Sequence, residues 1–127
     1  MGMKQPPLLR RFMDRNLKEA PWQKEIEDAL DFFGWWHSHN PPNVVVCPKC
    51  HWKIFRGIRK GIPDIWAIHP SGVMLWIECK TETGQLDRQQ REVGELIRAC
   101  GLRWIHARPR DREQLLHIIA HPEAPAA

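Results

Sequence analysis

Two short apolar runs in the middle of the chain carry its clearest hydrophobic pattern. They are Ile65–Ile68 and Val73–Ile77, and Pro70-Ser71-Gly72 lies between them. Apolar runs of this length on either side of turn residues predict the two strands of a β-hairpin. A three-residue loop that ends in a left-handed glycine places Ile65 opposite Ile77. Both faces of the strands are apolar, which predicts a sheet that other elements cover on both sides.

Helical spacing is found on both sides of this hairpin. Asn16 could cap the upstream helix, with Glu19 as its reciprocal capping-box partner. The apolar face of that helix stops before Gly34 and consists of Trp22, Ile26, Ala29, Leu30 and Phe33. Asp87 can cap a downstream helix, which Gly101 ends. The inner face expected for the downstream helix consists of Gln90, Val93, Leu96, Ile97 and Cys100.

Three further elements complete the pattern. Residues 35–39 and 102–107 have the composition of strands, and Asp111 can cap a short helix over Leu115 to Ile119. The order helix, strand, hairpin, helix, strand, helix predicts a single three-layer α/β domain, in which helices flank a small mixed β-sheet. We expect this domain at residues 16–121, after a basic flexible arm at 1–15. A basic insertion at about 40–60 and a disordered tail at 122–127 complete the organisation.

The predicted hairpin brings two acidic residues together at its open end. Its pairing continues past Ile65 and Ile77 to place Asp64 opposite Glu78, with the Cβ atoms roughly 4.5–5.5 Å apart. Two carboxylates at that separation repel each other unless a proton or a cation lies between them, and a divalent metal ion fits that role. Lys80 shares the face of Glu78, two residues further along the strand. The alternative is an exposed Asp, Glu and Lys at ordinary strand ends.

The upstream helix offers one more acid to this site. At 100° per residue, Glu19 points more nearly toward the apolar face than Glu25 or Glu27 does. Glu19 is therefore a candidate outer metal ligand. The alternative is that Glu19 only completes the capping box at the start of the helix.

The segment from Phe32 to Pro63 contains no acidic residue. Its basic residues alternate with aromatic ones, Trp52 and Phe55, which suits contact with a nucleic-acid backbone together with base stacking. The candidate DNA-binding residues are Lys49, Lys53, Arg56, Arg59 and Lys60. A solvated basic loop is the alternative.

Composition sets the broad class of the protein. The chain has 127 residues and a formal net charge of +4, which favours a polyanionic partner. It lacks an apolar run long enough to cross a bilayer and a signal-peptide pattern, so we expect no membrane association and a cytoplasmic location. Four cysteines in this spacing do not resemble a disulfide framework.

Cys47-Pro48-Lys49-Cys50 is half of a typical tetrahedral zinc site. The local candidates for further ligands are His37, His39 and His51, of which His37 and His39 would point the same way from a strand. A structural Zn²⁺ on Cys47, Cys50, His37 and His39 is therefore conceivable. Two reduced thiols in a loop are the alternative.

The chain resembles the PD-(D/E)xK nucleases, and within them the virus-type replication-repair nuclease (VRR-NUC) family. The resemblance covers roughly residues 17–120 and implies a restriction-endonuclease-like αβββαβ core that cleaves DNA with a divalent metal ion. The long CxxC-containing insertion departs from the family pattern. The residues that carry the resemblance are Gly61-Ile62-Pro63-Asp64, Glu78-Cys79-Lys80, Gly84, Leu86 and Gln90, with Glu19 and Gln23 upstream.

This resemblance suggests a role for each site residue. Asp64, Glu78 and the carbonyl of Cys79 would hold Mg²⁺ or Mn²⁺, Lys80 would assist the attacking water, and Gln90 could hold a ligand or the water. The expected function is a DNA endonuclease of bacterial or phage origin, acting in repair, recombination or phage replication. A preference for particular DNA structures and a homodimeric state are both compatible with it.

Two other functions compete with this one. A non-catalytic DNA-binding module organised around a zinc-bound CxxC loop would explain the basic segment but not the acidic pair. A zinc hydrolase that uses the histidines has only the sparse pair His37 and His39 and no HExxH motif. The nuclease accounts for more of the pattern than either.

Overall fold

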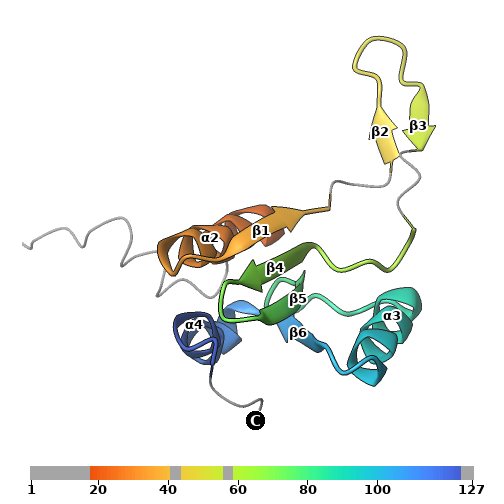
Figure 1. Cartoon of the computed structure of the whole chain (residues 1–127). Coiled ribbons are helices and arrows are strands. Elements are labelled where there is room, and N and C mark those ends of the chain that lie inside the picture. The colour runs from red at the N-terminus through yellow and green to blue at the C-terminus, as the bar shows by residue number, and fades with distance from the viewer. Residues whose placement is uncertain (1–17, 41–43, 56–58, 124–127) are drawn as a thin grey trace, which may run out of the picture.

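The computed structural model describes residues 18–40, 44–55 and 59–123, with the backbone alone at 44–46 and 53–55. The arm expected at residues 1–15 and the end of the tail, 124–127, lie outside the described residues. Within them the chain forms one four-stranded sheet with three helices around it, and a separate two-stranded sheet. Figure 1 shows this arrangement, with the small sheet standing away from the larger one.

The four-stranded sheet is mixed, as predicted. Its strand order is β1-β4-β5-β6, and β5 and β6 are its only parallel pair. The three-layer α/β fold expected from the element order is confirmed. The strands are β1 (Trp36–His39), β4 (Ile65–His69), β5 (Val73–Cys79) and β6 (Arg103–Ala107), and the helices are α2 (Glu19–Phe32), α3 (Arg88–Ala99) and α4 (Arg112–Ala120).

The β4–β5 hairpin has the predicted register. Ile65 pairs with Ile77, and the pairing continues to His69 and Val73. Gly72 closes the loop with φ +93°, and its N–H donates to the carbonyl of His69 at 2.9 Å. A side chain would be strained at that φ, so glycine is the residue that this turn requires.

The core lies between α2, α4 and one face of the sheet. Five odd-numbered residues of β4 and β5 face it and are fully buried: Ile65, Ala67, Leu75, Ile77 and Cys79. Two buried indoles fix the helices to the rest of the core. Trp22 Nε1 donates to the carbonyl of Ala107 at 3.0 Å, and Trp35 Nε1 donates to the carbonyl of Ile119 at 2.8 Å. These bonds satisfy polar atoms that burial would otherwise leave without partners.

The opposite face of the sheet is only partly covered, so the prediction of full cover on both sides is wrong. Helix α3 packs on β6, where Gly94 is buried so closely against Trp104 that a Cβ would lie 2.4 Å from the ring. On the inner strand β4, next to the other edge, Ile68 stays 37% exposed. Leu96, which is 65% exposed, and Cys100 also face solvent, contrary to the predicted inner face of this helix. The contact at Gly94 explains the difference, because it rotates the packed face away from both residues.

The starts of the helices test the capping predictions. Helix α3 begins as expected, with Asp87 accepting from the backbone N–H of Gln90 at 2.8 Å in a capping box. Helix α2 begins at Glu19, with Lys18 at its N-cap position and no side-chain cap from that residue, whereas Asn16, the predicted cap, lies outside the described residues. Before α4, Asp111 ends a 3₁₀ turn, η1 (Pro109–Asp111), and accepts from the N–H of Arg108. None of the helices in the described ranges is both long enough and apolar enough to span a bilayer.

The CxxC sequence lies at the tip of a second hairpin that the hydrophobic pattern did not predict. Its strands are β2 (Val44–Val46) and β3 (Lys53–Phe55), which pair antiparallel. Strands of three residues are too short to show a convincing period in the sequence. Within the insertion expected at about 40–60, residues 44–55 form a small β-ribbon.

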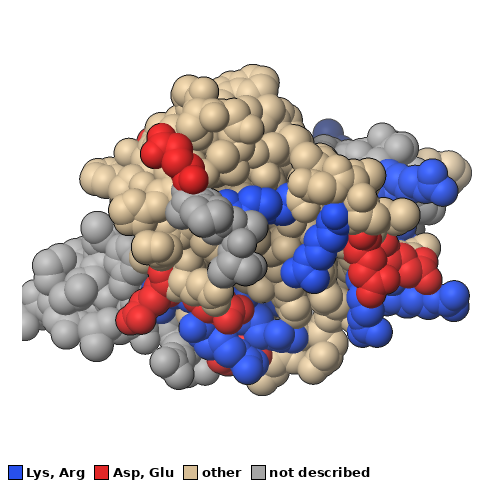
Figure 2. All heavy atoms as spheres, turned by 60° about the horizontal axis from the view of Figure 1, so that its bottom comes forward, with Lys and Arg blue, Asp and Glu red and all other residues tan. Residues whose placement is uncertain are grey.

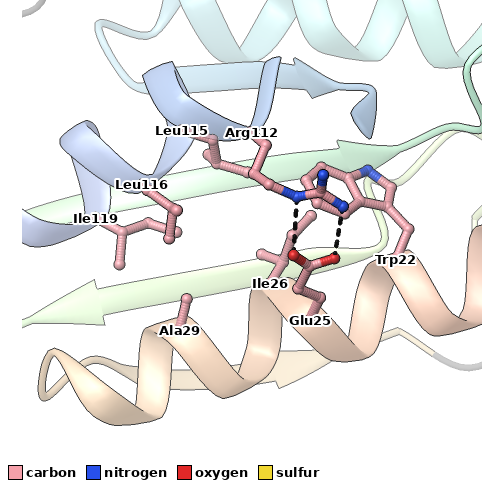
Figure 3. Close-up of a pocket in the computed structure, with 8 residues that line it drawn as sticks. All are labelled: Trp22, Glu25, Ile26, Ala29, Arg112, Leu115, Leu116 and Ile119. Atoms are coloured by element: carbon pink, nitrogen blue, oxygen red, sulfur yellow. Dashed lines mark hydrogen bonds and ion pairs between the residues drawn. The ribbon is translucent and has the colours of Figure 1, made fainter. Parts of the chain in front are cut away.

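A buried ion pair joins α2 to α4 (Figure 3). Arg112 Nε donates to Glu25 Oε1 at 2.9 Å and Nη2 donates to Oε2 at 3.1 Å. The guanidinium also lies over the ring of Trp22, 5.4 Å from its centroid. Glu25 is therefore the most deeply buried acid of α2, and the prediction that Glu19 points most nearly toward the core is wrong. The partner of Glu25 lies 87 residues away in the sequence, so helical geometry alone could not identify it.

Candidate active site

Asp64 and Glu78 lie together at the open end of the β4–β5 hairpin, as the register predicted. Asp64 precedes the first residue of β4, and Glu78 is the last residue but one of β5. Asp64 Oδ2 accepts from the backbone N–H of Cys79 at 2.8 Å, which holds its carboxyl group beside the end of β5. The two carboxyl groups interact directly with each other.

Asn40 holds the backbone of the Pro63-Asp64 pair. Its N–H donates to the carbonyl of Asp64 at 2.8 Å, and its side-chain Nδ2 donates to the carbonyl of Pro63 at 2.8 Å. The backbone bond extends the β1–β4 ladder by one residue beyond the strands, and the side-chain bond adds a second tie next to it. Sequence reasoning did not single out this asparagine, because its role depends on the pairing of β1 with β4.

Glu78 is a buried carboxylate with incomplete compensation. Its residue is 1% exposed. Oε1 accepts from Gln90 Nε2 at 2.8 Å, whereas Oε2 has no hydrogen-bond donor among the described residues. The neighbouring carboxyl of Asp64 is itself an acceptor unless it carries a proton. A buried acidic oxygen without a donor indicates a site that needs a proton or a cation.

Burial shifts the pKa of both acids in the same direction. Burial raises the pKa of Glu78 to about 8, with the charge of Asp64 as the next cause and Lys80 opposing them. Burial likewise raises the pKa of Asp64, against the opposing effects of the Cys79 N–H, of a hydrogen bond with Glu78 and of the charge of Lys80. At neutral pH the pair therefore holds a proton when no cation is bound.

The side chain of Gln90 makes two hydrogen bonds, one at the start of α3 and one to the acidic pair. Its Oε1 accepts from the backbone N–H of Asp87 at 3.0 Å, which completes the capping box of α3. Its Nε2 is then directed to Glu78. Gln90 therefore completes the capping box of α3 and also holds one oxygen of Glu78.

Lys80 is half-buried at the end of β5, where its charge acts on Asp64 and Glu78. Its backbone N–H donates to the carbonyl of Ala107 at 3.0 Å. The backbone at Gly84 lies against it: a Cβ there would be 3.5 Å from Lys80 Cδ and 2.9 Å from Thr81 Oγ1. A side chain at position 84 would therefore be too close to Thr81, whereas its contact with Lys80 would be an ordinary one.

Glu19 lies at the edge of this cluster. It is the first residue of α2 and is exposed, yet burial of its carboxyl raises its pKa, followed by the charge of Asp64, with Lys80 opposing. Glu19 lies close enough to Asp64 and Lys80 for both charges to affect the pKa of its carboxyl group. However, no group of three His, Cys, Asp or Glu side chains in the described ranges is arranged to hold a metal ion. The geometry is that of an acidic pair with a more distant third acid.

Cys79 contributes to the site only through its backbone. Its side chain is fully buried in the core, on the opposite face of β5 from Glu78. Burial raises the pKa of this thiol well above its usual range, with the charges of Asp64 and Glu78 adding to the effect. The thiol is therefore protonated, and a metal could contact the carbonyl but not the sulfur.

His106 is a site neighbour that sequence reasoning missed. It pairs with Glu78 across the parallel β5–β6 ladder, and its Nε2 is buried without a hydrogen-bond partner in the described structure. Burial lowers its pKa, followed by the charge of Arg108, so the ring is neutral at pH 7. The alternation of β6 could have identified His106 once the parallel pairing with β5 was assumed.

The predicted DNA-binding residues are accessible where they are described. Lys49, Arg59 and Lys60 are exposed. Arg56 and the side chain of Lys53 lie outside the described part. Figure 2 shows Lys and Arg side chains interspersed with Asp and Glu over one face of the molecule. DNA binding by the basic segment remains a prediction.

The structure does not bring the four candidate zinc ligands together. His37 Nε2 lies 2.7 Å from Asp31 Oδ1, and His39 Nδ1 lies 3.1 Å from Glu27 Oε1. Both histidines therefore face acids of α2, whereas Cys47 and Cys50 lie at the tip of the β2–β3 hairpin. Zinc binding by the two cysteines remains a prediction.

Comparison of the chain with protein-family models, with curated proteins and with solved structures found no match. The resemblance to the nuclease family therefore rests on the motif residues themselves. The arrangement of Asp64, Glu78, Lys80 and Gln90 at one end of the sheet is the observation on which a functional proposal can be based.

Proposed function

We propose that this protein is a Mg²⁺- or Mn²⁺-dependent deoxyribonuclease of the VRR-NUC type that hydrolyses DNA phosphodiester bonds. The observation that carries the proposal is the buried pair of Asp64 and Glu78. The pair combines a carboxylate oxygen without a donor, two acids in direct interaction and a lysine two residues beyond Glu78. A purely structural site would gain nothing from keeping two mutually repelling acids in a desolvated position.

The donor set fits a hard divalent cation. Asp64, Glu78 and the carbonyl of Cys79 supply only oxygen atoms, which Mg²⁺ and Mn²⁺ prefer. Mg²⁺ is commonly held by one or two carboxylates, with water and substrate phosphate completing its shell, so a third protein carboxylate in direct contact is not required. When bound, the ion would activate a water molecule and neutralise charge on the phosphoryl oxygens. Glu19 would hold water at the outer edge of that shell.

The remaining site residues act on the substrate and on the ligands. Lys80 would orient the attacking water and stabilise the negative charge that develops on the phosphoryl group. Gln90 fixes one oxygen of Glu78 through the 2.8 Å bond and leaves the other toward the cation. Gln90 is thus a positioning residue, whereas Lys80 would touch the reacting atoms.

The charge of the chain is consistent with DNA as substrate. The formal net charge is +4, and the acid-free segment precedes the acidic pair directly in sequence. Exposed Lys49, Arg59 and Lys60 would contact phosphates without reading bases. We place this activity in a reducing cytoplasm, in which the four cysteines stay as thiols.

The test is a cleavage assay on linear, flapped and branched DNA with Mg²⁺, Mn²⁺ or EDTA. We expect metal-dependent products from the wild-type protein and none from Asp64→Asn, with DNA binding kept because the basic surface is unchanged. Lys80→Ala should slow cleavage by about 10²–10⁴-fold, the usual contribution of a proton-transfer group. Glu95→Gln is the matched control, since it removes one exposed acid of α3.

Two outcomes would reject the nuclease. One is cleavage that persists in EDTA or in Asp64→Asn. The other is tight DNA binding by a folded wild-type protein that cleaves none of the substrates with either metal, which would favour the non-catalytic DNA-binding module.

A further inference from the structure

The tip of the β2–β3 hairpin is a tight turn that gathers two thiols. Cys47 N–H donates to the carbonyl of Trp52 at 2.9 Å, and His51 N–H donates back to the carbonyl of Cys47 at 2.9 Å. The side chains of Cys47 and Cys50 interact with each other across the turn. Both residues are accessible, so the pair faces outward.

The backbone of this turn is arranged to support a thiolate. The backbone N–H groups of Cys50 and Lys49 are directed at the Cys47 sulfur. His51 is the only non-glycine residue with positive φ in the described part, at +58°. Non-glycine residues with positive φ are strained, and they cluster at functional sites, where the surrounding structure holds the backbone in place. Here the positive φ of His51 directs its N–H to the carbonyl of Cys47, and this hydrogen bond closes the turn.

A metal held by this pair would lack half of its protein ligands within one chain. Structural zinc sites take four ligands. The described ranges contain no group of three His, Cys, Asp or Glu side chains arranged for a metal ion, and this includes the adjacent His51. Outside those ranges the sequence contains only one residue of these four types, Asp14. The other two cysteines are unsuited, because Cys79 is buried in the core and Cys100 follows α3 in the main domain.

We propose that Cys47 and Cys50 of two copies of this chain bind one Zn²⁺ through four sulfur atoms and join the copies at their hairpin tips. The four thiols lose four protons as four Zn–S bonds form, which leaves a site of net charge −2. Lys49 within each turn offsets part of that charge. Figure 1 shows the hairpin standing away from the four-stranded sheet, which makes its tip accessible to a second copy. This proposal does not depend on the nuclease activity.

The test combines metal analysis with molar mass. Protein purified without chelator should contain one zinc per two chains and have a mass in solution of about 30 kDa, twice the 15.0 kDa of one chain. Cys47→Ser and Cys50→Ser should each lose the zinc and become monomeric. Cys100→Ser is the matched control, an exposed thiol outside the turn, and should keep both properties. Replacement of zinc by Co²⁺ should give the intense thiolate-to-metal absorption of a tetrahedral sulfur site.

Several results would overturn the bridged site. They are a monomer with one zinc per chain, a dimer unchanged by Cys47→Ser, a metal-free protein that takes up no Zn²⁺ on titration, or a Cys47–Cys50 disulfide under reducing purification. Asp64→Asn separates this proposal from the nuclease, because it should leave zinc content and mass unchanged while cleavage disappears. Cleavage could likewise fail in the wild type without affecting the dimer.

Discussion

Two buried glutamates of this domain differ in how their charge is compensated. Glu25 on α2 is 6% exposed, and both of its oxygens accept from the guanidinium of Arg112. Glu78 on β5 is 1% exposed and lies next to a second acid, Asp64. Within the described part of the chain, the amide of Gln90 donates to one of its oxygens and no group donates to the other. The charge of Glu25 is thus neutralised by an ion pair, whereas Glu78 needs a proton or a cation.

This difference separates a structural acid from a candidate catalytic one. A buried carboxylate that is paired and fully bonded has a structural role, and removing its partner is costly. A buried carboxylate next to a like charge has a strongly raised pKa, and such groups cluster at functional sites. The contrast predicts opposite outcomes for the same substitution, Glu to Gln, at the two positions.

The largest effect is expected for Glu78→Gln. The glutamine can still accept from Gln90 but removes a metal ligand, so cleavage should fall on the order of 10³-fold or more. Without metal, the variant should be as stable as the wild type or more so at pH 8, by about 1–3 kcal/mol, because an uncompensated buried acid is gone. Turnover at saturating DNA and urea unfolding in EDTA measure the two effects. A variant that is strongly destabilised would indicate that Glu78 is structural.

Glu25→Gln should reverse this outcome. It leaves the guanidinium of Arg112 buried without its carboxylate, so the free energy of unfolding should fall by about 3–5 kcal/mol. Cleavage per folded molecule should be unchanged. Replacing Glu25 and Arg112 together by Met and Leu should recover most of the loss, which a double-mutant cycle measures. Loss of metal-dependent activity in the folded fraction would place Glu25 in the active site and contradict the comparison.

The raised pKa of Glu78 predicts how pH changes stability. Its pKa is about 8 in the fold against an ordinary value of 4.5, so the folded state binds the proton more tightly. The stability that this proton contributes is fully present below pH 4.5 and is lost as pH rises through about 8. Burial raises the pKa of Asp64 too, so Asp64 acts in the same direction. The metal-free wild type should therefore lose stability relative to Glu78→Gln over this range.

Metal binding should show the opposite trend over the same range. The ion replaces the proton, so its apparent affinity should rise roughly tenfold per pH unit until pH reaches about 8. Thermal melts with Mn²⁺ at pH 6, 7 and 8 test this, and Glu78→Gln is the control that should respond little. An affinity independent of pH would mean that the pair holds no proton.

The sequence was sufficient where local rules determine structure. The turn at Pro70-Ser71-Gly72 sets the register of the hairpin and hence the meeting of Asp64 and Glu78. The capping box of Asp87 and Gln90 depends only on residues three apart. Each of these features follows from contacts within a short stretch of chain. The geometry of the candidate site, which depends on both, was therefore largely predictable.

Long-range packing explains the errors. Glu25 is buried by Arg112 from α4, and Gly94 is buried by Trp104 from β6. Neither partner can be identified from helical periodicity, which describes a single helix. His106 was missed for a related reason, since its place beside Glu78 depends on β5 and β6 being parallel neighbours. These residues lie on elements whose relative positions the sequence pattern left open.

Glu19→Gln should have a smaller effect than Glu78→Gln. Glu19 lies at the edge of the acidic pair and is exposed, so it would act on water bound to the metal rather than on the metal itself. Outer residues of this kind change metal affinity or activity by about 10–100-fold. Glu27→Gln is the control on the same helix, because its carboxylate pairs with His39. Equal losses from both variants would indicate a general effect of α2 on stability and not a role at the site.

The smallest effect concerns DNA affinity at the exposed basic residues. Arg59→Glu and Lys60→Glu each remove a cation from the segment that leads into Asp64. If each contacts one phosphate, the slope of log affinity against log salt should become shallower by about one unit per variant, equally for unrelated DNA sequences. Turnover at saturating DNA should be unchanged, because neither residue reaches the acidic pair. Lys24→Glu on α2 is a charge-matched control, since it tests whether any exposed cation of the domain has the same effect. A loss of turnover with unchanged affinity would move these residues from DNA binding to catalysis.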